Sequence, residues 1–143
     1  METTLAVIGR QAACWENASA LESGLLTTLD LTSPVGLKRA YNVMQGEDLR
    51  AENVIGDILL VADVLIHGVA FENRETGEMS HALRTVLILP DGGTIACVSD
   101  GVVRSIMRLA SLGLKPPFVP PLECRIVKKK SGATRTYYSL ELI

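Results

Sequence analysis

The feature that most constrains the fold is a turn signal in the middle of the chain, Pro90-Asp91-Gly92-Gly93, with an apolar run on each side. The runs are 81–89 (HALRTVLIL) and 94–98 (TIACV). Asp-Gly between β-branched or apolar runs is the strongest short-range signal for a β-hairpin. The sequence therefore predicts two antiparallel strands joined by this turn.

A short helix and a second hairpin are predicted after the first hairpin. Ser99 or Asp100 can cap the helix, apolar residues recur at helical spacing from 102 to 110, and Gly113 can end it in the left-handed conformation. The connector 114–121 holds four of the six prolines and must be extended. Two more strands are expected at 122–130 and 134–143.

A long apolar run, Val54 to Phe71, is expected to form the first strand of the domain. Gly56 and Gly68 lie where such a strand would need a bulge or sharp bend to serve both sides of a barrel. Five strands with one helix between the third and fourth is the order of the OB-fold, a partly open Greek-key barrel. We therefore expect a mainly β protein, a five-stranded OB-fold.

The first fifty residues are predicted to form a helical extension that packs on the barrel, with residues 51–143 as the OB-fold domain. A length of 143 residues suits one domain. Leucines at helical spacing predict a short helix over 18–31. Ser33-Pro34 marks the start of a second helix, whose expected apolar stripe is Leu37, Ala40, Tyr41 and Met44.

Composition limits the partners and the compartment. The net charge of -2 gives no general attraction to nucleic acid or anionic membrane, so binding to either needs a local basic patch. Three cysteines without close spacing predict a reducing, cytoplasmic location. We expect no targeting or membrane segment, because the most apolar run, 58–66, is too short to span a bilayer.

The required basic patch surrounds the last predicted hairpin. On an OB-fold, the loop between strands four and five is one of two loops that close over a bound oligonucleotide or oligosaccharide. The alternative interpretation is a solvated hairpin tip whose lysines discourage edge-to-edge aggregation. Aromatic side chains would stack on bases, and further cations in the first loop and on strand two would contact phosphate. The candidate nucleic-acid-binding residues are Arg74, Arg84, Lys128, Lys129, Lys130, Arg135, Tyr137 and Phe71.

Other kinds of site are poorly supported. Cys97, His81 and Asp100 could form a nucleophile and base, but Cys97 lies in an apolar run and packing is its favoured role. Asp63 and His67 lie four residues apart, which does not bring ligands together on a strand. The chain also lacks a Gly-rich phosphate loop. We expect no enzyme, no cofactor and no metal site.

Three stretches carry a resemblance to a known family: 30–42 (DLTSPVGLKRAYN), 75–88 (ETGEMSHALRTVLI) and 98–102 (VSDGV), the last followed by the Pro-rich connector. In these stretches the chain resembles the small single-stranded DNA-binding proteins of bacteriophages and related mobile elements. The resemblance implies an OB-fold that coats replication intermediates with little sequence preference. Replication proteins would then be expected partners.

The leading hypothesis is a sequence-tolerant single-stranded DNA-binding protein, with RNA left open as a ligand. The rival is an OB-fold assembly module without nucleic-acid binding, which the acidic overall charge favours. Both hypotheses permit a homo-oligomer, since Thr4 to Ile8 could add a strand to a neighbour's sheet edge.

Overall fold

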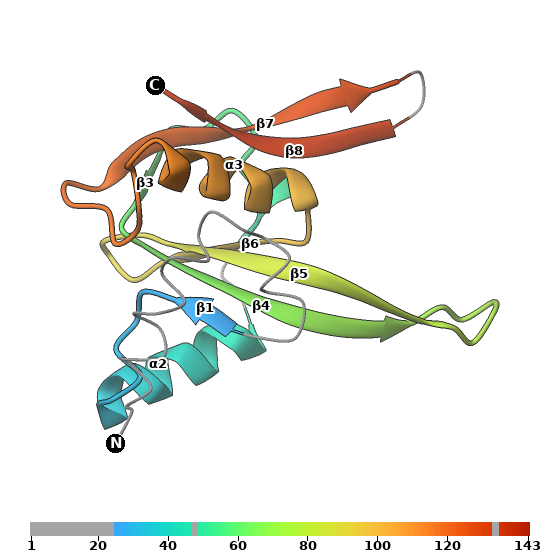
Figure 1. The fold of residues 1–143 in the computed structure, drawn as a ribbon, viewed down its shortest axis with the longest axis horizontal. Helices are drawn as coiled ribbons and strands as arrows, with labels where there is room; N and C mark the ends of the chain where they lie inside the picture. The colour runs from blue at the N-terminus through green and yellow to red at the C-terminus, as the bar shows by residue number, and fades with distance from the viewer. Residues whose placement is uncertain (1–24, 47–48, 133–134) are drawn as a thin grey trace.

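The computed structural model describes residues 25–46, 49–132 and 135–143, and they form a mainly β fold of two sheets. Helix α3 (Asp100–Ser111) lies between the two sheets, and helix α2 (Pro34–Gln45) covers the other face of the larger sheet (Figure 1). The predicted order of three strands, one helix and two strands is confirmed from residue 63 onward.

The larger sheet has the strand order β1-β4-β5-β6-β2, and the smaller sheet has the order β3-β7-β8. All pairs are antiparallel except β2 with β6. The strands are β1 (Leu25–Thr27), β2 (Leu49–Arg50), β3 (Leu59–Val61), β4 (Asp63–Glu72), β5 (Met79–Ile88), β6 (Thr94–Cys97), β7 (Leu122–Ser131) and β8 (Arg135–Leu142).

The central hairpin forms where the sequence predicts it. Strands β5 and β6 pair from Ile88–Thr94 to Thr85–Cys97. In the turn, the Gly93 N–H donates to Asp91 Oδ1 (2.8 Å), and Gly92 has a φ of +93°, which favours glycine. The turn chemistry therefore fixes the register of this hairpin.

The expected long strand is broken, and the bend is not at either predicted glycine. Gly56 lies in a turn before the strand, and Gly68 sits in a regular pair with Leu83. The break is at Ala62, whose N–H donates to Ile88 O (2.9 Å) and whose carbonyl accepts from Phe118 N (2.8 Å). Ala62 thus separates β3, which pairs with β7, from β4, which pairs with β5, so the chain passes from one sheet to the other.

The two sheets form an open barrel. They are joined on one side by the β3–β4 passage, while β2 and β8 are the edge strands on the other side. Between these edges no strand pairing is present in the described residues. The arrangement is consistent with the expected OB-fold, with the barrel left unclosed along this seam.

The helix predicted over 18–31 is wrong in its described part, because Leu25–Thr27 form strand β1. The reason is tertiary: β1 pairs with β4, Thr27 Oγ1 donates to Val64 O (3.1 Å), and Thr28 Oγ1 donates to Asp63 Oδ1 (2.7 Å). These long-range hydrogen bonds outweigh the helical spacing of the leucines. The rest of this predicted helix, 18–24, and the segment Thr4 to Ile8 lie outside the described residues.

Helix α2 begins as predicted, since Ser33 Oγ accepts the Gly36 N–H (3.0 Å) and Pro34 is the first helical residue. Its buried residues are Ala40 and Val43, which pack with Leu65 and Val86 of the larger sheet. The predicted stripe is wrong at two positions, because Leu37 and Tyr41 are 49% and 63% exposed. Small residues at the contact let the helix lie close to the sheet.

The division of the chain into an N-terminal extension (1–50) and an OB-fold domain (51–143) stays a prediction.

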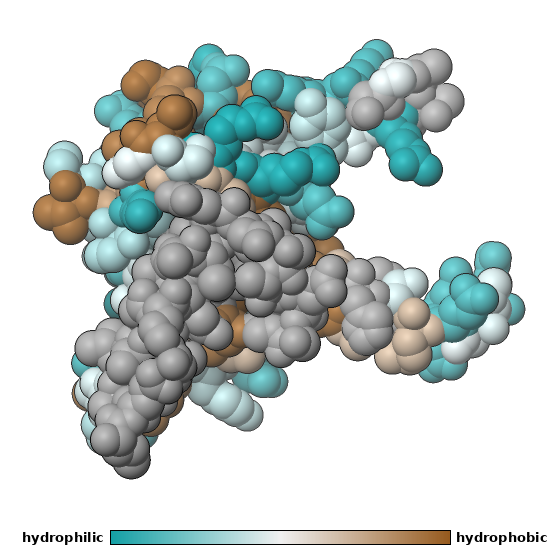
Figure 2. All heavy atoms as spheres, in the orientation of Figure 1, coloured by the Kyte–Doolittle hydropathy of each residue, from teal (hydrophilic) through white to brown (hydrophobic). Residues whose placement is uncertain are grey.

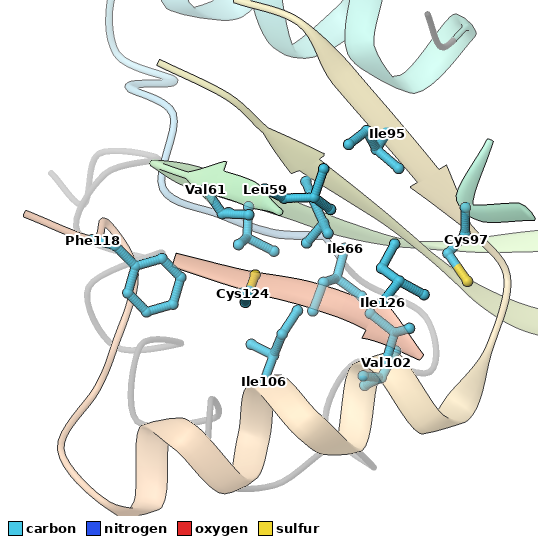
Figure 3. Packing of buried hydrophobic residues seen from close by; sticks show 14 of the residues in the cluster. Leu59, Val61, Ile66, Ile95, Cys97, Val102, Ile106, Phe118, Cys124 and Ile126 are labelled. Carbon is cyan, nitrogen blue, oxygen red and sulfur yellow. The ribbon is translucent and has the colours of Figure 1, made fainter. Parts of the chain in front are cut away.

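The main core lies between the sheets and under α3. Figure 3 shows Ile106 and Val102 of α3 directed toward Ile126 and Cys124 of β7, with Ile66 of β4 nearby and Phe118 at one end. Ile66, Ile106 and Ile126 are almost completely buried, and each such side chain contributes about 1.5–3 kcal/mol. This packing fixes α3 against β7 and β8.

The first turn of α3 approaches β8 so closely that only glycine fits at position 101. A Cβ there would lie 2.0 Å from Tyr138 O and 2.8 Å from Tyr137 Cδ2. Helix and strand meet here through backbone atoms, which have little freedom to move apart.

Gly101→Ala is expected to lower the free energy of unfolding by about 1–3 kcal/mol, because the methyl group overpacks this contact. Urea denaturation followed by circular dichroism measures the change. Gly46→Ala is the control, since a Cβ at this extended residue meets no atom within 4 Å. Equal stability of the two variants would contradict the close approach.

Candidate nucleic-acid interface

A cleft of about 670 Å³ lies where the start of α3 meets the β7–β8 hairpin. The β4–β5 and β7–β8 hairpins project in the same direction beyond α3 (Figure 1), and Figure 2 shows the surface hollowed between them. The ionisable and aromatic side chains that line the cleft are Asp100, Arg104, Lys128, Arg135, Tyr137 and Tyr138.

Lys128 lies on β7 at the point where the strand extends from the core into the cleft. Cys124 and Ile126 point inward and are fully buried, and the alternation of a strand puts Lys128 on the same face. The hairpin extends past the core at this point, and Lys128 lies opposite Tyr138 of β8. The inward face therefore changes from apolar to basic as the strand leaves the core.

Hydrogen bonds lock the first turn of α3 to β8 and so position the other wall of the cleft. Ser99 precedes the helix as predicted, but its hydroxyl donates to Tyr138 O (3.4 Å) instead of capping the helix. Ser105 Oγ donates to Gly101 O (2.9 Å) and accepts the Leu140 N–H (3.1 Å). The hydroxyl of Ser139, 3.0 Å away, then donates to Ser105. Arg104 is held beside the β7–β8 hairpin by this contact.

The electrostatics of the cleft favour anions. Among the described residues, three cations, Arg104, Lys128 and Arg135, line it together with one carboxylate, Asp100. The N-terminus of α3 adds a partial positive charge, which Asp100 in the first turn partly offsets. The cleft is therefore locally positive, although the net charge of the protein is -2.

The structure brings three of the eight predicted site residues together in the cleft: Lys128, Arg135 and Tyr137. Lys129 and Lys130 are exposed on the same hairpin, opposite Tyr137 and Thr136. Arg104 also lines the cleft and is not among the predicted residues. The sequence does place Arg104 on the polar side of the predicted helix, away from apolar residues 102, 103 and 106. Only the packing of α3 in the folded protein shows that this side of the helix faces the hairpin.

Arg74 and Phe71 lie on the other projecting hairpin. Arg74 is exposed in the β4–β5 loop, where Asn73 Oδ1 accepts the Glu75 N–H (2.9 Å). This loop region also contains Glu72 and Glu78, so the tip of the hairpin has a net negative charge. Phe71 lies on β4 opposite Ser80. Contacts of Arg74 and Phe71 with nucleic acid stay predictions.

Arg84 ties α2 to the larger sheet. Its guanidinium donates to Val43 O (3.1 Å) and Gly46 O (3.0 Å) at the end of α2, and Nη1 lies 3.1 Å from His67 Nε2. The face of β4 and β5 that carries Arg84 is the one covered by α2. The hydrogen bonds of Arg84 therefore serve to hold α2 on the sheet. Phosphate binding by Arg84 stays a prediction.

A comparison with known protein families bears on what this protein binds. A family model described as phage single-stranded DNA-binding protein matches residues 20–143. The chain belongs to this family. Single-stranded DNA is accordingly its ligand class, and the family is one of DNA-binding proteins, not a class of enzymes. No curated protein and no solved structure matches the chain.

The remaining chemical candidates in this phage DNA-binding protein have structural explanations. Burial raises the pKa of both Cys97 and Cys124 to about 11, so these thiols are protonated and unreactive near neutral pH. Within the described residues, no three His, Cys, Asp or Glu side chains are grouped to hold a metal ion. Neither described helix is long and apolar enough to cross a membrane.

His67, beside Arg84, makes the stability of the folded protein depend on pH. Burial, and then the charge of Arg84, lower the pKa of His67 below its usual 6.5. The unfolded chain thus binds a proton here at a higher pH than the folded chain does, so stability falls as the pH drops below about 6.5. His67→Gln is expected to remove part of this loss, because its amide oxygen can still accept from Arg84 without titrating.

Urea denaturation at pH 7.5 and pH 5.5 measures the effect. His81→Gln is the matched control, since it removes the only other histidine. If His67→Gln and the wild type lose equal stability between these two pH values, then the pKa shift at His67 is contradicted.

Proposed function

We propose that this protein binds single-stranded DNA in the cleft between α3 and the β7–β8 hairpin, with little sequence preference, and protects replication or recombination intermediates. The observation that carries the proposal is the convergence of Arg104, Lys128 and Arg135 with Tyr137 in one cleft of a family member whose ligand is single-stranded DNA. A positively charged groove with aromatic side chains is the usual arrangement for such binding.

The cations neutralise phosphates. Lys128 and Arg135 come from the two strands of one hairpin, and Arg104 comes from the helix facing it, so a DNA backbone in the cleft meets positive charge from both sides. Lys129 and Lys130, exposed on the same hairpin, extend this charge beyond the cleft. Because phosphate contacts carry no sequence information, binding of this kind tolerates any sequence.

Tyr137 supplies the stacking surface. It is half-buried, and its ring lies beside Gly101, which limits the directions in which it can turn. A ring with one side packed on the protein loses little freedom when a base stacks on its open side. Such stacking contributes about 1–3 kcal/mol per base.

The wider biological role follows the same proposal. The protein acts in the cytoplasm of the phage's bacterial host, as a homo-oligomer beside replication proteins. The exposure of Leu37 and Tyr41, which lie one turn apart on the same side of α2, supports self-association, because neighbouring apolar side chains on a surface favour contact with another protein. The family description favours this role over that of an assembly module without nucleic-acid binding, and DNA over RNA.

The double variant Lys128→Glu/Arg135→Glu is expected to weaken binding to oligo-dT and to flatten its salt dependence. Each lost phosphate contact removes about 0.7 from the log-log slope of affinity against salt, so the slope should fall by about 1.4. Fluorescence anisotropy titrations at several salt concentrations measure it. Arg39→Glu, an exposed charge reversal on α2, is the control, and an unchanged slope in the double variant would remove the hairpin from the site.

Tyr137→Ala is expected to weaken binding by about 1–3 kcal/mol with no change in the salt slope, because stacking releases no counterions. Tyr137→Phe keeps the ring and should bind as the wild type does. The same titrations measure both variants, and circular dichroism checks that they fold. A Tyr137→Phe loss as large as that of Tyr137→Ala would show that the hydroxyl, and not the ring, contacts the DNA.

A further inference from the structure

A second pocket, of about 340 Å³, continues from the cleft along the open seam of the barrel. Val98 and Tyr138 line both hollows and so form their common border. The other lining residues of the second pocket come from β2 and the residues after it, from β5 and from β6.

The pocket exists because the barrel does not close. In the described residues, strand β2 pairs with β6 through Leu49 and Arg50, and the chain then turns into a short 3-10 helix, Ala51–Asn53. Neither β2 nor β6 pairs with β8 in the described part of the chain. The seam therefore opens between the edge of the larger sheet and Tyr138 of β8.

The lining combines an apolar floor with positive charge. Ala51, Ala96 and Cys97 are small and buried, and Cys97 carries no charge near neutral pH because burial raises its pKa to about 11. Arg50 and Arg84 also line the pocket, and the carbonyls of Val43 and Gly46 hold the Arg84 guanidinium in place. Apolar side chains beside cations suit a nucleobase with a phosphate next to it.

Glu52 is the acidic residue among the described residues that line the same pocket. Its carboxylate lies 3.9 Å from Arg50, and both side chains are more than half exposed. An exposed pair of this kind is weak, so a phosphate can compete with Glu52 for Arg50. Among the described residues that line the pocket, the two cations outnumber the one carboxylate.

We infer that the pocket lined by Arg50, Arg84, Ala96 and Cys97 is a second nucleotide subsite, into which a DNA strand held in the cleft continues across Val98. This inference rests on the proposed function. A base lies on the apolar floor against Tyr138, and Arg50 contacts the adjoining phosphate. The bound strand thus follows the seam of the barrel, past the end of α2, where Arg84 and Ala96 reach the pocket.

The experiment is a length series of oligo-dT, from about 4 to about 16 nucleotides, the range of site sizes for one OB-fold. Short oligonucleotides fill the cleft alone, and longer ones reach the second pocket. Arg50→Glu and Arg50→Gln are expected to weaken binding of the long oligonucleotides about tenfold or more, the value of one charged hydrogen bond, and to leave the shortest ones unchanged. Arg39→Glu is again the control.

Equal affinities of both Arg50 variants and the wild type at every length would overturn the inference. Loss of binding to the shortest oligonucleotides as well would also overturn it, because Arg50 would then belong to the first site. The two variants guard against a folding artefact, since Arg50→Gln places no extra carboxylate beside Glu52.

The double variant Lys128→Glu/Arg135→Glu separates this inference from the function on which it rests. It should lose affinity at every length if the cleft is the entry site. If it binds like the wild type while Arg50→Glu does not, the cleft proposal fails and the second pocket stands as a site of its own.

Photo-crosslinking gives an independent readout. An oligonucleotide with 5-iododeoxyuridine at each position in turn is expected to crosslink to residues 96–98 or Tyr138 from one end and to Tyr137 from the other. Crosslinks confined to the hairpin residues 128–137 would overturn the second subsite.

Discussion

The site depends on the close contact between the first turn of α3 and strand β8. Gly101 lets the helix reach the carbonyl of Tyr138, and the hydroxyl of Ser105 bridges the two backbones. This contact decides where the helix starts relative to the hairpin, and so places Arg104 opposite Lys128 and Arg135. Without it, the same cations would lie on separate exposed elements, where screening by water and salt would make each of them weak.

A second constraint is the position of α2 over the larger sheet. Its small residues pack on Leu65 and Val86, and Arg84 binds the carbonyls at its end. The face of the strands that an OB-fold usually offers to a ligand is therefore occupied by the protein's own helix. The accessible positive surface lies instead along the seam where the barrel fails to close, which is where the cleft and the second pocket meet.

The elements predicted correctly are those that local chemistry determines. Asp91-Gly92 fixes the central hairpin, Ser33-Pro34 begins α2, and Gly113 follows α3 with a φ of +98°. The errors occur where distant partners decide. Leu25–Thr27 form a strand because they pair with β4. The long strand bends at Ala62 because the residues before it pair with β7 of one sheet and the residues after it pair with β5 of the other. Tyr41 is exposed because α2 packs through smaller residues.

The sequence by itself determined the order of strands and helix from residue 63 onward, the basic hairpin and the family, because turn residues, apolar periodicity and charge runs are properties of neighbouring residues. It placed Lys128, Arg135 and Tyr137 on one hairpin for the same reason. Only the tertiary structure decided that Arg104 joins them and that Arg84 faces α2. Those positions depend on how a helix docks on an edge strand, and docking is set by packing between residues far apart in the chain.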